Sequence, residues 1–329
     1  MKQVLIDKYG RQLNYLRLSV TDRCNLRCYY CMPEEGMQFA SRKDLLSFEE
    51  MYLLVAIFCS LGLSKVRITG GEPFVRNGIM PFLENISTLE GLDEITITTN
   101  ATLTGKYIQQ LKAIGIRKIN ISLDSLDKER FYAITRRDSF NTVYNTIFTL
   151  LNEGFDIKLN CVLSASKNVD DIIPFIELTK AYPLSVRFLE EMPFNGSDSF
   201  EDVNWNYKDI YNHISQHYDE VFTLENGTSS TSINYAIPGY KGTFGIIPAF
   251  SRTFCGTCNR IRLSATGELR TCLYGAPAAN LRDDLRSGAD EEAIQDIILE
   301  AVSGRLRDGF AAEAMNMKTV HDSMSVLGG

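Results

Sequence analysis

The feature that most constrains the fold is a regular alternation of strand-like and helix-like segments between residues 14 and 192. The strand-like runs are Tyr15–Val20, Lys65–Thr69, Glu94–Thr99, Lys118–Leu123, Lys158–Leu163 and Ser185–Leu189. Stretches of about a dozen residues with a helical pattern of apolar positions lie between them. Six consecutive strand–helix units predict a parallel sheet with right-handed crossover connections.

Helix boundaries in the sequence support this count. Ser47 is followed three residues later by Glu50, a spacing typical of a capping box that opens a helix. The helical pattern runs through Ser60, and Gly62 is placed to stop it. A second helix is predicted to begin at Asn141 and to end near Gly154.

Polar residues recur with a period of two along the six strands, so they share one face of the predicted sheet. That face carries Arg17, Ser19, Arg67, Thr69, Thr96, Thr98, Asn100, Asn120, Ser122, Asp124, Lys158, Asn160 and Arg187. A closed eight-stranded barrel fills its interior with bulky apolar side chains. We therefore predict an α/β fold, an incomplete (β/α)6 TIM-type barrel whose lumen holds a large polar ligand. An ordinary sheet with a few buried polar groups remains the alternative.

Composition restricts the possible partners. The chain has 329 residues, a formal net charge of −7 and a pI near 5.2, so nucleic acid and anionic membrane surfaces would be repelled at long range. No apolar run approaches the ~20 residues of a membrane helix, and the first eight residues are too short and charged for a secretory signal. Two short groups among the eight cysteines favour metal ligation in a reducing compartment. We expect a cytoplasmic protein.

The first group of cysteines is Cys24, Cys28 and Cys31. No histidine lies near them, since the chain's histidines are His213, His217 and His321. Four-iron clusters are normally held by four thiolates, so three thiolates would leave one iron open for chemistry. The alternative is a zinc knuckle completed by a distant ligand, although this spacing matches no usual zinc pattern.

A second group, Cys255, Cys258 and Cys272, again supplies three cysteines without a histidine. A zinc ribbon that lacks one ligand, or a cluster used for electron storage, are alternatives to a cluster with an open iron that binds substrate. Between the two groups, Gly70-Gly71-Glu72-Pro73 directly follows a predicted strand. The glycines there allow backbone to approach a ligand closely.

Cations gather on the predicted polar face of this acidic chain. Arg260 and Arg262 are two apart and project from one side of an extended strand. With Arg17, Arg67, Lys158 and Arg187 they make up to six cations facing one lumen. Guanidinium groups bind phosphates through paired hydrogen bonds, so this set predicts a polyphosphate ligand. The chain contains no GxxxxGK[ST] motif, which excludes a P-loop nucleotide site.

The segment Cys24-Asn-Leu-Arg-Cys-Tyr-Tyr-Cys-Met-Pro33 resembles the cluster loop of radical S-adenosylmethionine (SAM) enzymes. Together with Gly70-Gly71-Glu72-Pro73, the second cysteine group, Cys258-Asn-Arg-Ile-Arg-Leu263 and the terminal Gly328-Gly329, it makes the chain similar to GTP 3′,8-cyclases. The similarity extends from Arg17 to Gly329.

This resemblance implies roles for named residues. Two [4Fe–4S] clusters would be held, one by Cys24, Cys28 and Cys31 and the other by Cys255, Cys258 and Cys272. SAM would be lined by Tyr30, Gly71, Ser122 and Met192. GTP would be contacted by Arg17, Arg67, Thr98, Lys158, Arg260, Ile261 and Arg262, with Arg187 as a further candidate. Glu191 departs from the aromatic or apolar residue that relatives often carry at its position.

The resemblance also implies a reaction. A lyase of this family uses SAM to generate a 5′-deoxyadenosyl radical, which abstracts hydrogen from ribose C3′ of GTP, and C3′ then attacks guanine C8. The product, (8S)-3′,8-cyclo-7,8-dihydroguanosine 5′-triphosphate, begins molybdenum cofactor (molybdopterin) biosynthesis. Two further readings stay open: a radical SAM enzyme that matures peptides or sulfatases, and a non-enzymatic iron–sulfur redox sensor.

The implied partners are a flavodoxin- or ferredoxin-type reductant, the next pathway enzyme, cyclic pyranopterin monophosphate synthase, and a second copy of the chain in a homodimer. We expect the partial barrel with its N-terminal cluster in residues 1–240. Residues 241–329 would carry the auxiliary cluster and the Gly-Gly tail, which the resemblance places in the active site.

Overall fold

The computed structural model describes residues 4–32, 37–192, 205–225, 227, 229–316 and 323–327. Six parallel strands form its centre: β1 (Tyr15–Ser19), β2 (Lys65–Thr69), β3 (Glu94–Thr99), β4 (Lys118–Ser122), β5 (Asp156–Leu163) and β6 (Ser185–Glu190). Every boundary lies within two residues of the predicted one. The predicted α/β architecture with a parallel-rich sheet, consistent with a partial TIM barrel, is confirmed.

Two further parallel strands extend this sheet beyond the six that the sequence predicted. β9 (Thr243–Ile247) pairs with β6, and β10 (Arg260–Leu263) pairs with β1. Antiparallel strands complete both edges: β7 (Phe222–Thr223), β8 (Ile233–Ala236), β11 (Glu268–Arg270) and β12 (Ala279–Asn280). The strand order is β12-β11-β10-β1-β2-β3-β4-β5-β6-β9-β8-β7, so the sheet is open.

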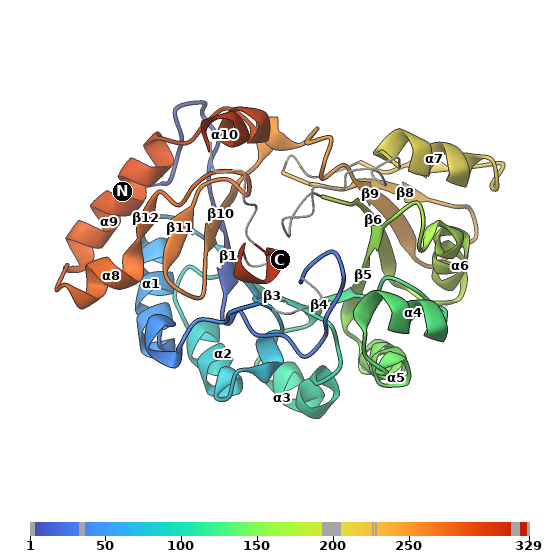
Figure 1. Ribbon diagram of the computed structural model, residues 1–329, viewed down its shortest axis with the longest axis horizontal. Coiled ribbons are helices and arrows are strands. Elements are labelled where there is room, and N and C mark those ends of the chain that lie inside the picture. Colours follow the sequence, from blue (N-terminus) through green and yellow to red (C-terminus); the bar gives the residue numbers. More distant parts are fainter. Residues whose placement is uncertain are drawn as a thin grey trace.

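The sheet curves around a central space, with helices on its outer side (Figure 1). The helices that follow the central strands are α1 (Phe48–Ser60), α2 (Ile79–Ser87), α3 (Ile108–Ala113), α4 (Lys128–Thr135), α5 (Phe140–Asn152) and α6 (Ile172–Ala181). Later helices are α7 (Tyr207–Ser215), α8 (Leu281–Arg286), α9 (Glu291–Ser303), α10 (Gly309–Met315) and α11 (Met324–Leu327). In Figure 1, α11 is the red helix beside the label C, and it is seen within the curve of the strands.

The predicted capping box at the start of α1 is confirmed. The Ser47 hydroxyl accepts a hydrogen bond from the Glu50 amide at 3.1 Å, and the Glu50 carboxylate accepts one from the Ser47 amide at 2.6 Å. α1 ends at Ser60, as predicted. The helix predicted from Asn141 is α5, which begins one residue earlier and ends two residues before Gly154.

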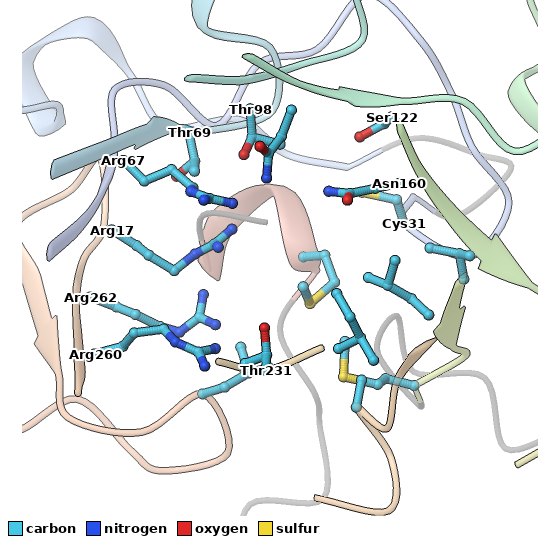
Figure 2. A pocket seen from close by; sticks show the side chains of 18 of the residues that line it. Arg17, Cys31, Arg67, Thr69, Thr98, Ser122, Asn160, Thr231, Arg260 and Arg262 are labelled. Atoms are coloured by element: carbon cyan, nitrogen blue, oxygen red, sulfur yellow. The ribbon is translucent and has the colours of Figure 1, made fainter. Parts of the chain in front are cut away.

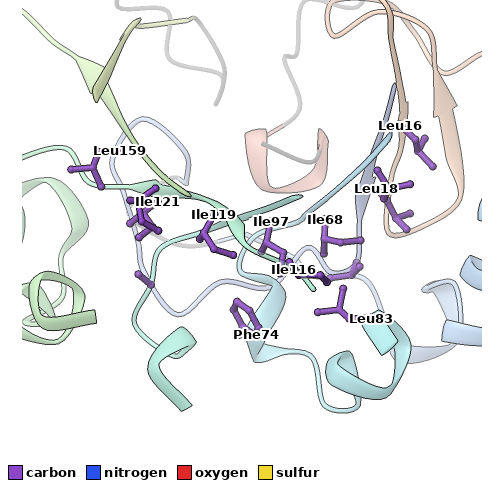
Figure 3. Packing of buried hydrophobic residues seen from close by; sticks show 14 of the residues in the cluster. Leu16, Leu18, Ile68, Phe74, Leu83, Ile97, Ile116, Ile119, Ile121 and Leu159 are labelled. Carbon is purple, nitrogen blue, oxygen red and sulfur yellow. The ribbon is translucent and has the colours of Figure 1, made fainter. Parts of the chain in front are cut away.

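Apolar side chains on the outer face of the strands form the main core. Leu16, Ile68, Ile97 and Ile119 are completely buried against the surrounding helices. Figure 3 shows this layer beneath the strands, with Leu83 of α2 among it. Because one face of each strand is committed to this core, the alternation leaves the other face free for polar groups.

The boundary predicted at residue 240 falls in the turn between β8 and β9, and the division into residues 1–240 and 241–329 stays a prediction. Within the described part of the chain, no helix combines the length and the apolar character needed to cross a membrane.

Candidate active site

The inner face of the curved sheet lines a cavity of about 310 Å³ that is partly open to solvent. Polar side chains from β1 to β6 and β10 reach it: Arg17, Arg67, Thr69, Thr98, Asn120, Ser122, Asn160, Arg187, Arg260 and Arg262. Figure 2 shows four of these arginines along one wall, with Asn160 and Cys31 across the space.

Three arginines stand in a row across neighbouring strands. In the parallel registers, Arg17 on β1 is the partner of Arg262 on β10 and of Arg67 on β2. Burial, and then the charge of Arg262, holds the pKa of Arg17 well below its ordinary value. Burial followed by the charge of Arg260 lowers the pKa of Arg262 to about 10. This concentration of like charge favours an anionic ligand with several negative groups.

The remaining residues predicted to contact GTP differ in their position relative to the cavity. Arg187 lines the cavity, and burial, followed by the charge of Arg67, lowers its pKa to about 10. Lys158 is not among the lining residues, and its Nζ lies 4.0 Å from Asp156 Oδ2 near the start of β5. Burial, followed by the charge of Arg187, lowers its pKa. Ile261 is completely buried in the apolar core, so its backbone alone could reach a ligand.

The first cysteine group lies in the loop that follows β1, and all three thiols line the cavity. Cys31 and Met32 donate their amides to the Cys28 carbonyl at 3.0 Å, which folds the loop into a compact turn. Arg27 and Tyr29 bind the end of α4 through backbone hydrogen bonds to Thr135 and Ile134. The loop therefore presents its thiols toward the lumen from a fixed backbone.

The two glycines after β2 are required by their packing against this cysteine loop. A Cβ atom on Gly70 would lie 2.4 Å from the Thr21 carbonyl oxygen, and one on Gly71 would lie 2.4 Å from that of Arg23. The Gly71 amide donates to the Thr21 carbonyl at 2.8 Å, and the Glu72 amide donates to Arg23 at the same distance. The close approach expected at these glycines is thus made to the backbone that leads into Cys24.

Glu72 ties the same loop to the end of β3. Its side chain is completely buried and accepts hydrogen bonds from the amides of Phe74 and Asn100 and from the Thr99 hydroxyl, at 2.7 to 3.1 Å. Burial raises its pKa to about 7 despite these three donors. The carboxylate therefore fixes two loops at the carboxyl ends of adjacent strands.

The second cysteine group lies across the same cavity. Cys255 begins the short turn η6 (Cys255–Thr257), Cys258 directly follows that turn, and Cys272 follows β11. All three cysteines line the lumen. Burial raises the pKa of Cys258, but the positive charges of Arg260 and Arg305 outweigh it, and the net shift is downward. The fold thus brings together two cysteine groups that are more than two hundred residues apart in sequence.

Neither group is arranged around a single ion. Among the described residues, no three His, Cys, Asp or Glu side chains lie close enough to hold one metal ion. Structural zinc needs four ligands at about 2.0–2.3 Å from one centre. Three cysteine thiols that line one lumen are a donor set that suits an iron–sulfur cluster with one open iron.

The residues predicted to line SAM all reach the cavity: Tyr30, Gly71, Ser122 and Met192. The Tyr30 hydroxyl donates to Asp124 Oδ2 at 2.8 Å, and Val162 donates its amide to Asp124 Oδ1 at 2.9 Å. Met192 Sδ accepts a hydrogen bond from the Tyr274 hydroxyl at 3.3 Å. Glu191 also lines the cavity. Gly328 and Gly329 lie outside the described residues.

Sequence reasoning proposed no role for Arg11, Arg305 or Tyr274, which also line the cavity. None of the three belongs to a motif. Arg11 precedes the first strand and Arg305 follows α9, so their approach to the second cysteine group depends on tertiary structure. No local signal in the sequence marks them.

Two family models match the chain, the Radical SAM superfamily over residues 18–179 and Molybdenum Cofactor Synthesis C over residues 184–310. A GTP 3′,8-cyclase of Heliobacterium modesticaldum is 40% identical, over 92% of this chain and 93% of that protein. The mitochondrial GTP 3′,8-cyclase of Arabidopsis thaliana is 39% identical, over 100% of this chain and 84% of that protein.

Other curated relatives are longer than this chain. Molybdenum cofactor biosynthesis protein 1 of Bos taurus is 41% identical over 92% of this chain, which spans 48% of that protein. The chain thus spans about half the length of several curated relatives it matches. Among solved structures, Streptococcus suis SuiB has a TM-score of 0.65 at 12% identity, over 97% of this chain and 78% of that one. That likeness shows the fold.

Proposed function

Because this chain belongs to the GTP 3′,8-cyclase family of the Radical SAM superfamily, we propose that it converts GTP to (8S)-3′,8-cyclo-7,8-dihydroguanosine 5′-triphosphate. This reaction would be the first step of molybdenum cofactor biosynthesis, catalysed by a lyase. One observation carries the proposal: both cysteine groups and the row formed by Arg262, Arg17 and Arg67 line the same cavity.

The two cysteine groups fit a pair of clusters. Each offers three thiols to the lumen, and all eight cysteines of the chain are free of disulfide bonds. Cys24, Cys28 and Cys31 would hold one [4Fe–4S] cluster, and Cys255, Cys258 and Cys272 a second. When bound, these groups would supply the electron that cleaves SAM and a site for the guanine edge.

The protein's own residues would orient SAM beside the first cysteine group. Tyr30 is held by its hydrogen bond to Asp124, and Met192 by its contact with Tyr274. The Gly71 backbone is fixed against the cysteine loop through its hydrogen bond to Thr21. These anchored groups would set the position of SAM before reaction, which lowers the entropic part of the barrier.

The arginine row would bind the triphosphate of GTP. Guanidinium groups offer paired hydrogen bonds to phosphate oxygens, and Arg17, Arg67 and Arg262 face one wall of the cavity (Figure 2). Thr98 and Ser122 lie along the lumen from this row toward the first cysteine group. The triphosphate bound there would direct the nucleoside toward the space between the two cysteine groups.

The C-terminal segment supports exclusion of water from this space. Met324 and Ser325 of α11 line the cavity, and the Ser323 hydroxyl donates to the Cys31 carbonyl. A radical formed in a water-filled site would be quenched, so a segment packed at the first cysteine loop fits radical chemistry. We extend the proposal to Gly328 and Gly329, which would reach the active site from here.

The remaining predictions about partners are part of this proposal. A flavodoxin- or ferredoxin-type protein would supply electrons, a second copy of the chain would form a homodimer, and cyclic pyranopterin monophosphate synthase would consume the product. The free cysteines support a reducing compartment such as the cytoplasm. The family also includes a relative named as mitochondrial.

Anaerobic reconstitution tests the proposed function. The protein is loaded with iron and sulfide, and SAM, dithionite and GTP are added. We expect 5′-deoxyadenosine and a cyclised guanosine triphosphate, and neither product when GTP is replaced by ATP. Cleavage of SAM that is indifferent to GTP would favour a peptide- or sulfatase-maturing enzyme. No cleavage with any nucleotide would favour the redox sensor.

A further inference from the structure

The chain segment that precedes β1 is joined to the second cysteine group by a buried cluster of charges. The Asp7 carboxylate has no exposed surface, and its Oδ2 lies 2.6 Å from Arg11 Nε and 3.6 Å from Arg305 Nη1. The side chains of both arginines are also less than 10% exposed. Asp7 is therefore the shared counter-charge of two buried guanidinium groups, which we call the Asp7 cluster.

Both arginines of the Asp7 cluster also donate hydrogen bonds to backbone carbonyls around the cysteines. Arg11 Nη1 donates to the Cys255 carbonyl at 3.0 Å, and Arg305 Nη1 donates to the Cys258 carbonyl at 2.8 Å. Arg11 also donates to the carbonyls of Leu306 and Arg307, at 2.8 and 2.6 Å. The cluster thus contacts the backbone of two of the three cysteines directly, together with the loop between α9 and α10.

The cysteine loop needs such support because its own structure is slight. η6 contains three residues, and the backbone amides of Cys255, Thr257 and Cys258 donate to the carbonyls of Arg252, Phe254 and Cys255 over 3.2 to 3.3 Å. The side chain of Asn259 adds one more bond to the N-terminal segment, donating to Asn14 Oδ1 at 2.7 Å. Hydrogen bonds from charged donors are stronger than neutral ones, so the two arginines dominate the set.

The charge state of Asp7 suits this role. Burial raises its pKa, but hydrogen bonds from the backbone and side chain of Arg11 and from the Tyr9 amide outweigh burial, and the net shift is downward. The carboxylate is therefore ionised at neutral pH. Removing its charge would leave two buried guanidinium groups without their counter-ion, which is strongly unfavourable.

We propose that Asp7, Arg11 and Arg305 are positioning residues for the second cysteine group, holding Cys255 and Cys258 in the geometry that accepts a cluster. The inference rests on the proposed function, since it assumes that these cysteines bind iron. It assigns a task to the N-terminal segment, which no predicted motif includes.

Two cysteine backgrounds separate the effect on each group. The triple variant with Cys24→Ser, Cys28→Ser and Cys31→Ser keeps only the second cysteine group. The triple variant with Cys255→Ser, Cys258→Ser and Cys272→Ser keeps only the first. Asp7→Asn is introduced into both. After anaerobic reconstitution, iron and sulfide per chain are measured, and the electron paramagnetic resonance spectrum of the dithionite-reduced protein is recorded.

We expect Asp7→Asn to reduce iron in the background that keeps the second group from about four atoms per chain to less than half, with loss of its spectrum. The background that keeps the first group should retain its iron and its spectrum. Equal loss in both backgrounds would show a general effect on folding and would overturn the proposal. Full iron in both would overturn it as well.

Asp171→Asn is the matched control. Asp171 is also a buried carboxylate, 3% exposed in its side chain, with Oδ2 3.2 Å from Arg130 Nε, but it bonds Ser125 and Leu126 rather than either cysteine group. It should leave iron in the second group unchanged. If it removes iron as Asp7→Asn does, loss of any buried ion pair suffices and the specific role is refuted.

A conservative pair keeps the test decisive if Asp7→Asn fails to fold by circular dichroism. Arg305→Lys keeps a charged donor near the Cys258 carbonyl, whereas Arg305→Met removes it. We expect Arg305→Lys to retain several-fold more iron in the second group than Arg305→Met, and equal retention would overturn the proposal. Iron loading needs neither SAM nor GTP, so this inference can fail while GTP-dependent SAM cleavage by the unmodified protein persists.

Discussion

Arg17 on β1 and Arg262 on β10 are direct neighbours in a parallel strand pair. Their pairing places a strand from the end of the sequence beside the first strand of the sheet, and with it the second cysteine group across from the first. Two like charges held side by side in a buried lumen are unfavourable without an anion. The pairing of β1 with β10 therefore determines both the positive charge and the shape of a polyphosphate site.

The first prediction concerns this row. Arg17→Gln should raise the dissociation constant for GTP about 10- to 100-fold, because one charged hydrogen-bonding group contributes ~1.5–3 kcal/mol. Arg17→Lys should recover part of the loss, since it keeps the charge but not the paired geometry. Isothermal titration with GTP, GDP and guanosine measures the effect.

The loss of affinity caused by Arg17→Gln should be largest for GTP and smallest for guanosine, which lacks the phosphates. Binding of SAM should stay unchanged. An equal loss for all three ligands would contradict a phosphate role for this residue.

The second prediction concerns the contact between the glycine loop and the cysteine loop. Gly71→Ala places a Cβ atom 2.4 Å from the Arg23 carbonyl oxygen, so one of the two backbones must move. We expect a destabilisation of ~1–3 kcal/mol, as for other overpacked sites, and loss of iron from the first cysteine group. Urea unfolding and iron analysis measure both.

Gly105→Ala is the matched control for Gly71→Ala. Its added Cβ would meet the Thr146 hydroxyl at an ordinary 3.5 Å. This variant should keep its iron and its stability. If both alanine variants behaved alike, the account of the glycine loop would be wrong.

The third prediction follows from the buried Glu72 carboxyl. Burial raises its pKa from 4.5 to about 7, so the native state binds this proton more tightly than the unfolded chain does. The stability that Glu72 contributes is therefore present at low pH and declines as pH rises from about 4.5 to about 7. The decline amounts to about 3 kcal/mol, because one pKa unit corresponds to about 1.4 kcal/mol.

Urea unfolding of the cluster-free protein at pH 5 and pH 8 tests the effect, with Glu72→Gln as the comparison. The stability of the unmodified protein relative to Glu72→Gln should fall between the two pH values. A relative stability that stays constant or rises with pH would refute the assignment.

The fourth prediction concerns the pair formed by Tyr30 and Asp124. Tyr30→Phe leaves the buried Asp124 Oδ2 without the hydroxyl that donates to it at 2.8 Å. Loss of that donor should lower the free energy of unfolding of the cluster-free protein by ~1–3 kcal/mol. Tyr132→Phe, at a tyrosine that is 56% exposed on α4, should change it by less than ~0.5 kcal/mol. Similar values for both tyrosines would show that the pair contributes little.

Much of the fold could be predicted because each central strand carries its own local pattern. In β2, for example, Val66 and Ile68 face the core while Arg67 and Thr69 face the lumen. Because alternate residues of a strand face opposite sides of the sheet, one sequence pattern predicted both the limits of each strand and its polar inner face. Capping by Ser47 was equally local.

Contacts between distant segments were not visible in this way. The strand Arg260–Leu263 was expected to be extended, but its pairing with β1 depends on how the whole sheet closes. The same holds for the contacts of Arg11 with Cys255 and of Arg305 with Asp7, which join segments far apart in the sequence. For Lys158, the alternation predicted the face of the strand, but it could not show that the side chain lies 4.0 Å from Asp156 and outside the cavity lining.

The most direct test of the central claim follows one hydrogen atom. GTP labelled with deuterium at ribose C3′ is incubated anaerobically with the reconstituted protein, SAM and dithionite, and 5′-deoxyadenosine is analysed by mass spectrometry. The account predicts 5′-deoxyadenosine that carries the deuterium, formed together with the cyclised nucleotide. Unlabelled 5′-deoxyadenosine, formed at the same rate with or without GTP, would contradict it.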